Sequence, residues 1–222
     1  MGTKLNTYKI RKCVLILTLF FLASCTKEVL YLSNDFEFPA SLSPVKESYI
    51  VGDTIDIKIQ FNKILEDREK KIKYLFENYN FETSVRIVEL TNKSESLVGQ
   101  PGSIQSFQFL NKIGGIFPFG SGGGELDLVF TNESYVHSSS MILRKPGVYA
   151  ISLIINTRQP AQLINPPVGY DQITAGVGAT FFILNSGEGL NFHLITKNTA
   201  SNFDNPSAED WARPVFAFRV EE

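Results

Sequence analysis

The chain has 222 residues, with 21 Lys and Arg against 23 Asp and Glu, and a formal net charge of −2. A chain of this length can bury a core large enough for one or two domains. Nucleic-acid binding is not expected, because it needs clustered Lys and Arg and this chain is net negative.

The first 24 residues have the composition of a secretory signal peptide. A basic stretch comes first, an apolar run at residues 14–22 follows, and the small residues Ala23 and Ser24 end the segment. A membrane-spanning helix needs roughly 20 apolar residues, about twice the length of this run. The basic residues before the run and the polar chain after it also argue against a buried core helix. We therefore expect residues 1–24 to be cleaved. The four cations of the basic stretch are Lys4, Lys9, Arg11 and Lys12.

The four residues Leu22-Ala23-Ser24-Cys25 resemble the lipobox of bacterial lipoproteins. The resemblance implies cleavage just before Cys25 and attachment of a diacylglyceryl group to its thiol, which makes Cys25 the lipid attachment site and the membrane the first partner. One acyl chain holds a protein only marginally, whereas two or three on one cysteine hold it stably. Thr26 stands where similar Gram-negative lipoproteins carry an aspartate for inner-membrane retention. This implies the outer membrane, on its periplasmic face or at the cell surface. Thr26-Lys27-Glu28 also resembles the short charged export tag of Bacteroidota surface lipoproteins.

Removal of residues 1–24 would leave 198 residues with 17 basic and 23 acidic side chains, a net charge of −6. Electrostatic attraction to anionic lipid is not expected of such a chain. Cys13 would be lost and Cys25 lipidated, so a hydrophobic core rather than a disulfide must hold the fold. Residues 25–45 have few periodic signals and several Pro and Ser, which predicts a flexible tether after the lipidated cysteine. Residues 46–222 are expected to form a single β-sandwich domain.

Apolar and polar residues alternate with a period of two along several segments, which is typical of half-buried strands. The clearest case is residues 54–61, where Ile55, Ile57, Ile59 and Phe61 share one face. Glycine- and proline-containing turns separate the segments, and residues 179–184 and 190–194 read as a hairpin. This pattern predicts an all-β fold, an antiparallel β-sandwich. Further strands are expected at residues 84–90, 104–110, 125–130, 140–143, 148–155 and 215–220.

The segment from Tyr49 to Phe61 resembles the opening strands of an immunoglobulin-like module in a secreted bacterial protein. The resemblance implies an immunoglobulin-like architecture and says nothing of activity. Residues 62–78 are ambiguous, because their apolar residues fit a helical stripe that begins at Asn62 and also alternate as in a strand at Ile72, Tyr74 and Phe76. Two strands joined at residues 66–71 are the favoured interpretation.

The sequence contains no recognisable catalytic or metal-binding motif. His137 and His193 are far apart and match no ligand spacing, so neither a metal nor another cofactor is expected. Gly120-Ser121-Gly122 lacks the strand–turn–helix context of a hydrolase nucleophile and the lysine of a phosphate loop, and it reads as a hairpin loop. Asp56, Glu125 and Asp127 are expected on solvated strand faces, although sequence alone leaves open a carboxylate pair for glycoside hydrolysis.

Two long segments are candidates for contact with a ligand or partner, because loops on a rigid scaffold often carry function. Residues 113–124 present Phe117 and Phe119 among glycines, and residues 157–177 contain Tyr170 and three prolines. The leading hypothesis is a lipid-anchored, non-catalytic envelope module that binds or assembles with a protein partner. The alternatives are a glycan-binding module of an outer-membrane nutrient-uptake system, with these aromatics as its platform, and a glycosidase with an unrecognised carboxylate pair.

Overall fold

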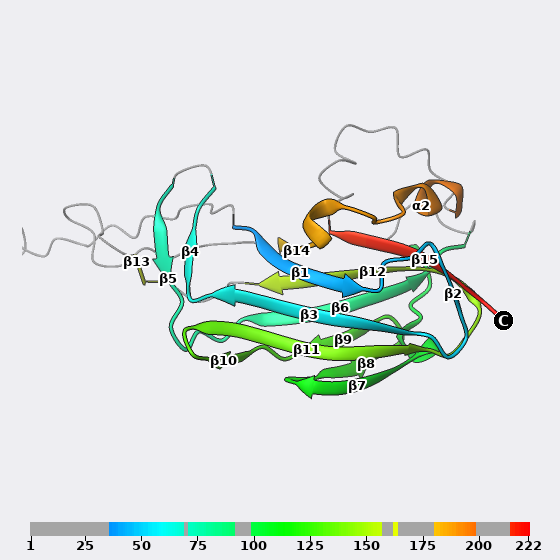
Figure 1. Cartoon of the computed structure of the whole chain (residues 1–222), viewed down its shortest axis with the longest axis horizontal. Helices are drawn as coiled ribbons and strands as arrows, with labels where there is room; N and C mark the ends of the chain where they lie inside the picture. Colours follow the sequence, from blue (N-terminus) through cyan, green and yellow to red (C-terminus); the bar gives the residue numbers. More distant parts are fainter. Residues whose placement is uncertain (1–35, 69–70, 92–98, 157–161, 164–179, 199–213) are drawn as a thin grey trace, which may run out of the picture.

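The computed structural model of the chain describes residues 36–68, 71–91, 99–156, 162–163, 180–198 and 214–222. Strands dominate this part of the chain, and the α-helix labelled α2 lies against one side of it (Figure 1). The strands are β1 (Phe38–Ser43), β2 (Ser48–Ile50), β3 (Thr54–Asn62), β4 (Ile64–Glu66), β5 (Lys73–Leu75), β6 (Glu82–Glu89), β7 (Phe107–Ile113), β8 (Ile116–Phe119), β9 (Gly123–Leu126), β10 (Val129–Thr131), β11 (Ser134–Leu143), β12 (Gly147–Asn156), β13 (Gln162–Leu163), β14 (Thr180–Leu184) and β15 (Val215–Glu221). The helices are η2 (Ile104–Ser106), η3 (Asn185–Gly187) and α2 (Phe192–Asn198).

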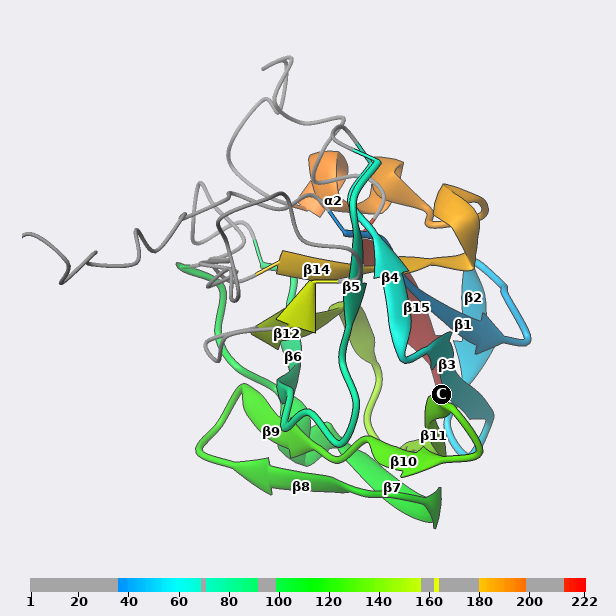
Figure 2. The same cartoon turned by 90° about the vertical axis from the view of Figure 1, so that its left-hand side faces the viewer.

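Twelve of the strands form one hydrogen-bonded sheet that folds over itself into two layers; nine of them make a continuous path from β10 to β8, and β2, β7 and β15 branch from it. We call β1, β3, β7, β10 and β11 the β3 layer, and β2, β6, β8, β9, β12, β14 and β15 the β12 layer. The layers are joined on one side, where β1 pairs in parallel with β14. On the other side, β7 and β10 are the last strands of the β3 layer and β8 is the last strand of the β12 layer. We call this side the open edge; its three strands lie together at the bottom of Figure 2. The predicted all-β sandwich is confirmed.

Alternation along the strands builds the core between the layers. Along β3 the buried positions are Ile55, Ile57, Ile59 and Phe61, while their neighbours face outward. Along β12 the buried set begins at Tyr149 and continues through Ile151, Leu153 and Ile155, and both sets belong to one hydrophobic cluster. Each such side chain contributes about 1.5–3 kcal/mol when it is fully removed from water, so the period-two pattern selects which face turns inward.

Aromatic side chains close the joined side of the sandwich. The ring of Phe38 lies 5.2 Å from that of Phe61 and 5.9 Å from that of Phe182, centroid to centroid, in edge-on arrangements that aromatic pairs prefer. Phe38 belongs to β1, so the expected tether at residues 25–45 is wrong for residues 38–43, which form an inner strand. The sequence does not reveal this strand because its inward-facing residues, Phe38, Ala40 and Leu42, form only a short alternating pattern that lies among prolines.

Residues 62–78 contain two short strands, as the favoured interpretation predicted. β4 and β5 pair antiparallel, with Leu65 opposite Tyr74. Tyr74 and Phe76 are buried beneath Phe36, and their rings lie 5.3 and 5.5 Å from the Phe36 ring. Burial, followed by the nearby Asp67 carboxylate, raises the pKa of Tyr74 to about 12. The hairpin is therefore an extension of the core rather than a surface appendage.

Three expected strands differ from the structure. In the segment 104–110, residues 104–106 form η2 and the strand begins only at Phe107. Residues 190–194 do not pair with β14; α2 covers this region instead, and Leu194 and Ile195 pack on Ala150 and Ala217 of the β12 layer. The outward side chains there are small and apolar, so a helix can seat on them and remove them from water. Residues 125–130 form two strands, β9 in one layer and β10 in the other, because the chain crosses between the layers at Asp127 and Leu128.

Truncation of the core should be costly. Ile57→Ala and Ile151→Ala each remove a buried side chain from one of the two facing layers, so each should lower the free energy of unfolding by about 2–5 kcal/mol. Urea denaturation of the full chain, followed by circular dichroism, measures this. The matched control is Ile64→Ala, which removes a side chain that is 42% exposed and should cost far less. Equal losses at all three positions would contradict the two-layer core.

Candidate binding surfaces

Phe117 and Phe119 lie on β8, not on the flexible loop that the sequence predicted. β8 pairs with β9 through four residue pairs, and Gly120–Gly122 make the turn between them. Ile116 is buried, so alternation turns Phe117 and Phe119 outward, where they are 52% and 58% exposed. Glycine is needed at position 114, because its φ is +66° and a Cβ there would lie 2.3 Å from the Asp127 carbonyl oxygen. Two exposed rings are therefore fixed on an edge strand.

Other large apolar side chains are exposed at the same edge. Leu110 and Ile113 on β7 are each 46% exposed, and Val129 on β10 is 38% exposed. Val129 stands opposite Val136 of β11, and Ile113 stands opposite Ser138. We call Leu110, Ile113, Phe117, Phe119 and Val129 the open-edge surface; it holds five of the nine exposed large apolar residues in the described part of the chain. More than half of the exposed large apolar residues in the described ranges therefore lie on these three edge strands.

A buried histidine ties the segments of the open edge together. His137 of β11 has its Nδ1 2.9 Å from the Asp127 carbonyl oxygen and its Nε2 2.9 Å from Ser139 Oγ. A carbonyl only accepts, so Nδ1 carries the proton and Nε2 accepts from the serine hydroxyl. Burial lowers the pKa of His137, which keeps the ring neutral. Ser139 is itself fully buried, so this Ser–His pair is a structural contact that no substrate can reach.

A hollow of about 280 Å³ adjoins Phe119 on the β12 layer. Glu125 and Asp127, two of the carboxylates considered from the sequence, line it. Glu82 also lines it, because β6 and β9 pair with Ser84 opposite Glu125; the sequence offers no signal for this third acid. Asp56 lies elsewhere, on the β3 layer, where the Ser140 hydroxyl and then Lys112, 2.9 Å away, lower the pKa of its carboxyl.

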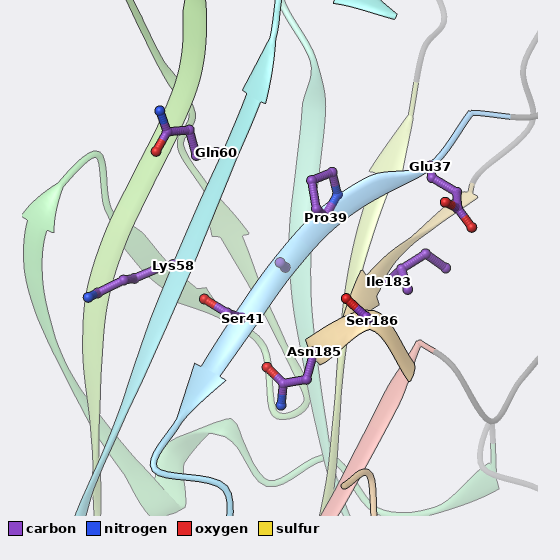
Figure 3. Close-up of a pocket in the computed structure, with 9 residues that line it drawn as sticks. Glu37, Pro39, Ser41, Lys58, Gln60, Ile183, Asn185 and Ser186 are labelled. Atoms are coloured by element: carbon purple, nitrogen blue, oxygen red, sulfur yellow. The ribbon is translucent and has the colours of Figure 1, made fainter. Parts of the chain in front are cut away.

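A groove of about 640 Å³ lies on the outer face of the β3 layer beside the joined side of the sandwich. Figure 3 shows Pro39 and Ser41 along β1, with Lys58 on one side of them and Ser186 on the other. The groove could not be predicted from sequence, because β1 was expected in the tether and residues 185–189 in a hairpin loop. The lining residues are Glu37, Pro39, Ala40, Ser41, Lys58, Gln60, Ile183, Asn185 and Ser186.

The remaining candidates from the sequence are dispersed or lie outside the described residues. Cys25 and Tyr170 belong to segments that the structure does not describe, so their assigned roles stay predictions. His193 is exposed on α2 beside Glu47, with 3.2 Å between Nε2 and the carboxylate. Within the described ranges, His, Asp and Glu form no group of three that could hold a metal ion. No helix among these residues is both long enough and apolar enough to span a bilayer.

The fold defines the class of the protein as an all-β sandwich, and comparison with known proteins adds no family. No family model matches the chain, and no curated protein matches it. Among solved structures, the reeler domain of human F-spondin is similar at 11% identity, covering 73% of this chain and 95% of that one, with a TM-score of 0.28.

Two type II cohesins from Acetivibrio cellulolyticus are similar to a comparable degree. The second type II cohesin module of its cellulosomal adaptor scaffoldin is 10% identical over 67% of this chain and 97% of that one, with a TM-score of 0.26. Another type II cohesin domain from its cellulosome is 13% identical over 66% and 95%, with a TM-score of 0.26. TM-scores this low do not assign the chain to either family.

The open edge should loosen in acid. Below the ordinary histidine pKa of about 6.5 the unfolded chain takes up a proton at His137 that the folded chain resists, so the free energy of unfolding should fall as pH falls. Urea denaturation of the full chain between pH 7.5 and 5 measures the slope. His137→Asn should flatten it, whereas the exposed His193→Asn is the control. An unchanged slope in His137→Asn would show that another group is responsible.

Proposed function

We propose that this protein is a lipid-anchored module of the cell envelope that binds a protein partner through its open-edge surface and has no catalytic role. The observation that supports this most directly is the concentration of exposed Leu, Ile, Val and Phe on the three edge strands β7, β8 and β10. Protein interfaces have apolar, aromatic centres surrounded by polar rims, and this edge has that composition.

The edge is rigid enough to serve as a preformed binding surface. Asp127 donates its N–H to the Gly115 carbonyl at 2.8 Å and accepts from His137 at its own carbonyl, so the β7–β8 turn, the β9–β10 crossing and β11 move as one unit. A surface that is ordered before binding loses less conformational entropy when the partner arrives. The fixed rings of Phe117 and Phe119 are the anchors we expect to contribute most.

Docking through side chains fits this edge better than strand addition. Pro118 lacks a backbone N–H and interrupts the row of donors that another strand would need on β8. Lys112 places a charge on β7, and charged or proline-bearing edge strands resist pairing with foreign strands. The partner is therefore expected to present an apolar patch of its own rather than an extended edge.

Substitution at the open edge tests the binding proposal. A Phe117→Ala, Phe119→Ala variant of the full chain, solubilised in detergent, should lose most of its co-purifying partner, with a fall of about tenfold or more for two anchors. The matched control is Ile50→Ala, Val51→Ala, which removes side chains that are 56% and 39% exposed at the end of β2 and in the turn that follows it, outside the open-edge surface. Equal capture by the Phe variant and the control would contradict the proposed surface.

Glycan binding is a second candidate, favoured by the hollow beside Phe119. An exposed ring, Asn80 and three carboxylates around about 280 Å³ could stack on a sugar and accept its hydroxyl groups. A glycan array probed with the same Phe variant separates the two functions, because only sugar binding would give a signal that the substitution removes. A third outcome is hydrolysis of a glycan by the wild-type chain that is lost on substitution of Glu82, Glu125 or Asp127 alone. This outcome would contradict both binding functions and support the glycosidase hypothesis.

The lipid anchor is a separate part of the proposal and rests on the lipobox-like sequence. Cys25→Ala should abolish labelling by a fatty-acid analogue and release the protein from the membrane fraction, because no other lipid attachment site is expected. The wild-type chain should fractionate with the outer membrane. Labelling that persists in Cys25→Ala would refute the anchor without bearing on the open-edge surface.

A further inference from the structure

The groove on the β3 layer has an excess of hydrogen-bond donors. Lys58 forms no ion pair with any described residue, and it lines the groove together with Ser41 and Ser186. The acid that lines the groove, Glu37, is paired with Arg68 at 2.9 Å. The cation that lines the groove is therefore Lys58, whose side chain extends from β3 on the side away from Ser41 and Ser186 (Figure 3) and whose charge also helps to lower the pKa of the Asp56 carboxyl.

The wall formed by η3 is held in an uncommon backbone conformation. Asn185 and Ser186 have φ of 48° and 58°, in the left-handed region that non-glycine residues seldom occupy. Asn185 Oδ1 accepts the Leu42 N–H at 2.8 Å, and its Nδ2 is buried with no partner among the described residues. Consecutive left-handed residues and an unsatisfied buried donor both occur preferentially where a structure serves a ligand.

The backbone around the groove excludes an added peptide strand. β1 pairs with β14 through residues 38–40 and with β3 through residues 40–43. Beyond the end of β14, the Asn185 side chain takes the next free N–H, that of Leu42. An extended peptide would therefore find no row of unpaired backbone groups, which strand addition requires.

The floor of the groove is apolar and small. Pro39 and Ile183 stand opposite each other in the β1–β14 pairing and lie side by side between the donors. A ligand that fits must combine an apolar face with many acceptors and one negative charge. A sugar ring carrying a carboxylate has all three, because its C–H groups form a face, its hydroxyls accept, and its carboxylate forms a charge-assisted hydrogen bond with an ammonium.

We propose that this groove binds an acidic oligosaccharide along its length, with Lys58 pairing the carboxylate of one uronic-acid unit and Ser41, Gln60 and Ser186 contacting hydroxyls of that unit and of its neighbours. The site lies on β1 and β3, on the joined side of the sandwich, whereas the open-edge surface lies on the opposite side. The proposal therefore does not depend on the protein partner, and either can fail alone.

Isothermal titration calorimetry of the full chain in detergent, with trigalacturonate as the probe, tests whether the groove binds an acidic saccharide. Trigalacturonate should bind, and Lys58→Gln should weaken binding about tenfold or more, as expected for loss of a charge-assisted hydrogen bond. Lys73→Gln is the matched control, because Lys73 is an exposed lysine on β5, outside the groove. Lys58 is exposed, so its substitution should leave the circular dichroism spectrum unchanged.

Two further probes test which chemical class of ligand the groove binds. Galactotriose, which is the neutral counterpart, should bind more weakly than trigalacturonate and should be insensitive to Lys58→Gln. Triglutamate, an acidic peptide, should not compete. The proposal is overturned by absence of binding, by equal loss in Lys58→Gln and Lys73→Gln, by equal affinity for the neutral trimer, or by triglutamate binding as well as the uronate.

Discussion

Packing of two layers against one core is the constraint on which the other features of the molecule depend. Because strand side chains alternate, burial of one residue exposes the next. Ile57 and Ile59 turn inward, so Lys58 and Gln60 must face the groove; Ile116 turns inward, so the neighbouring Phe117 turns outward. The candidate binding residues are therefore held by core residues one position away, and stability and recognition share the same strands.

The path of strands closes on one side only, and the two sides differ accordingly. The β1–β14 pairing and the rings around Phe38 seal the joined side with hydrogen bonds and apolar contacts. The open edge has no such pairing between β7 and β8, and His137 compensates by linking β11 to the β9–β10 crossing. An edge held by a few polar contacts can keep apolar side chains exposed without collapse, which suits it to binding.

Outward surfaces of the sandwich are covered to different degrees. α2 seals the apolar stretch around Ala150 and Ala217, so that surface is structural. The outer face of the β3 layer at Ser41 and Lys58 is polar and needs no cover, which leaves its groove open to small polar ligands. The proposed protein-binding edge and the proposed saccharide groove thus occupy regions of opposite chemistry, as an envelope module with two kinds of contact would require.

Local pattern was enough to predict the strands whose alternation is long, such as β3 and β12, and the β4–β5 hairpin. It was not enough for β1, for α2, for the position of Phe117 and Phe119 on a strand, or for the split between β9 and β10, since those depend on which layer receives each segment. The sandwich class could be predicted from sequence, because period-two burial is a local property. Tertiary structure alone decided the groove, the Glu82–Glu125 hollow and the His137 contacts, because each joins residues from distant strands whose register no local pattern encodes.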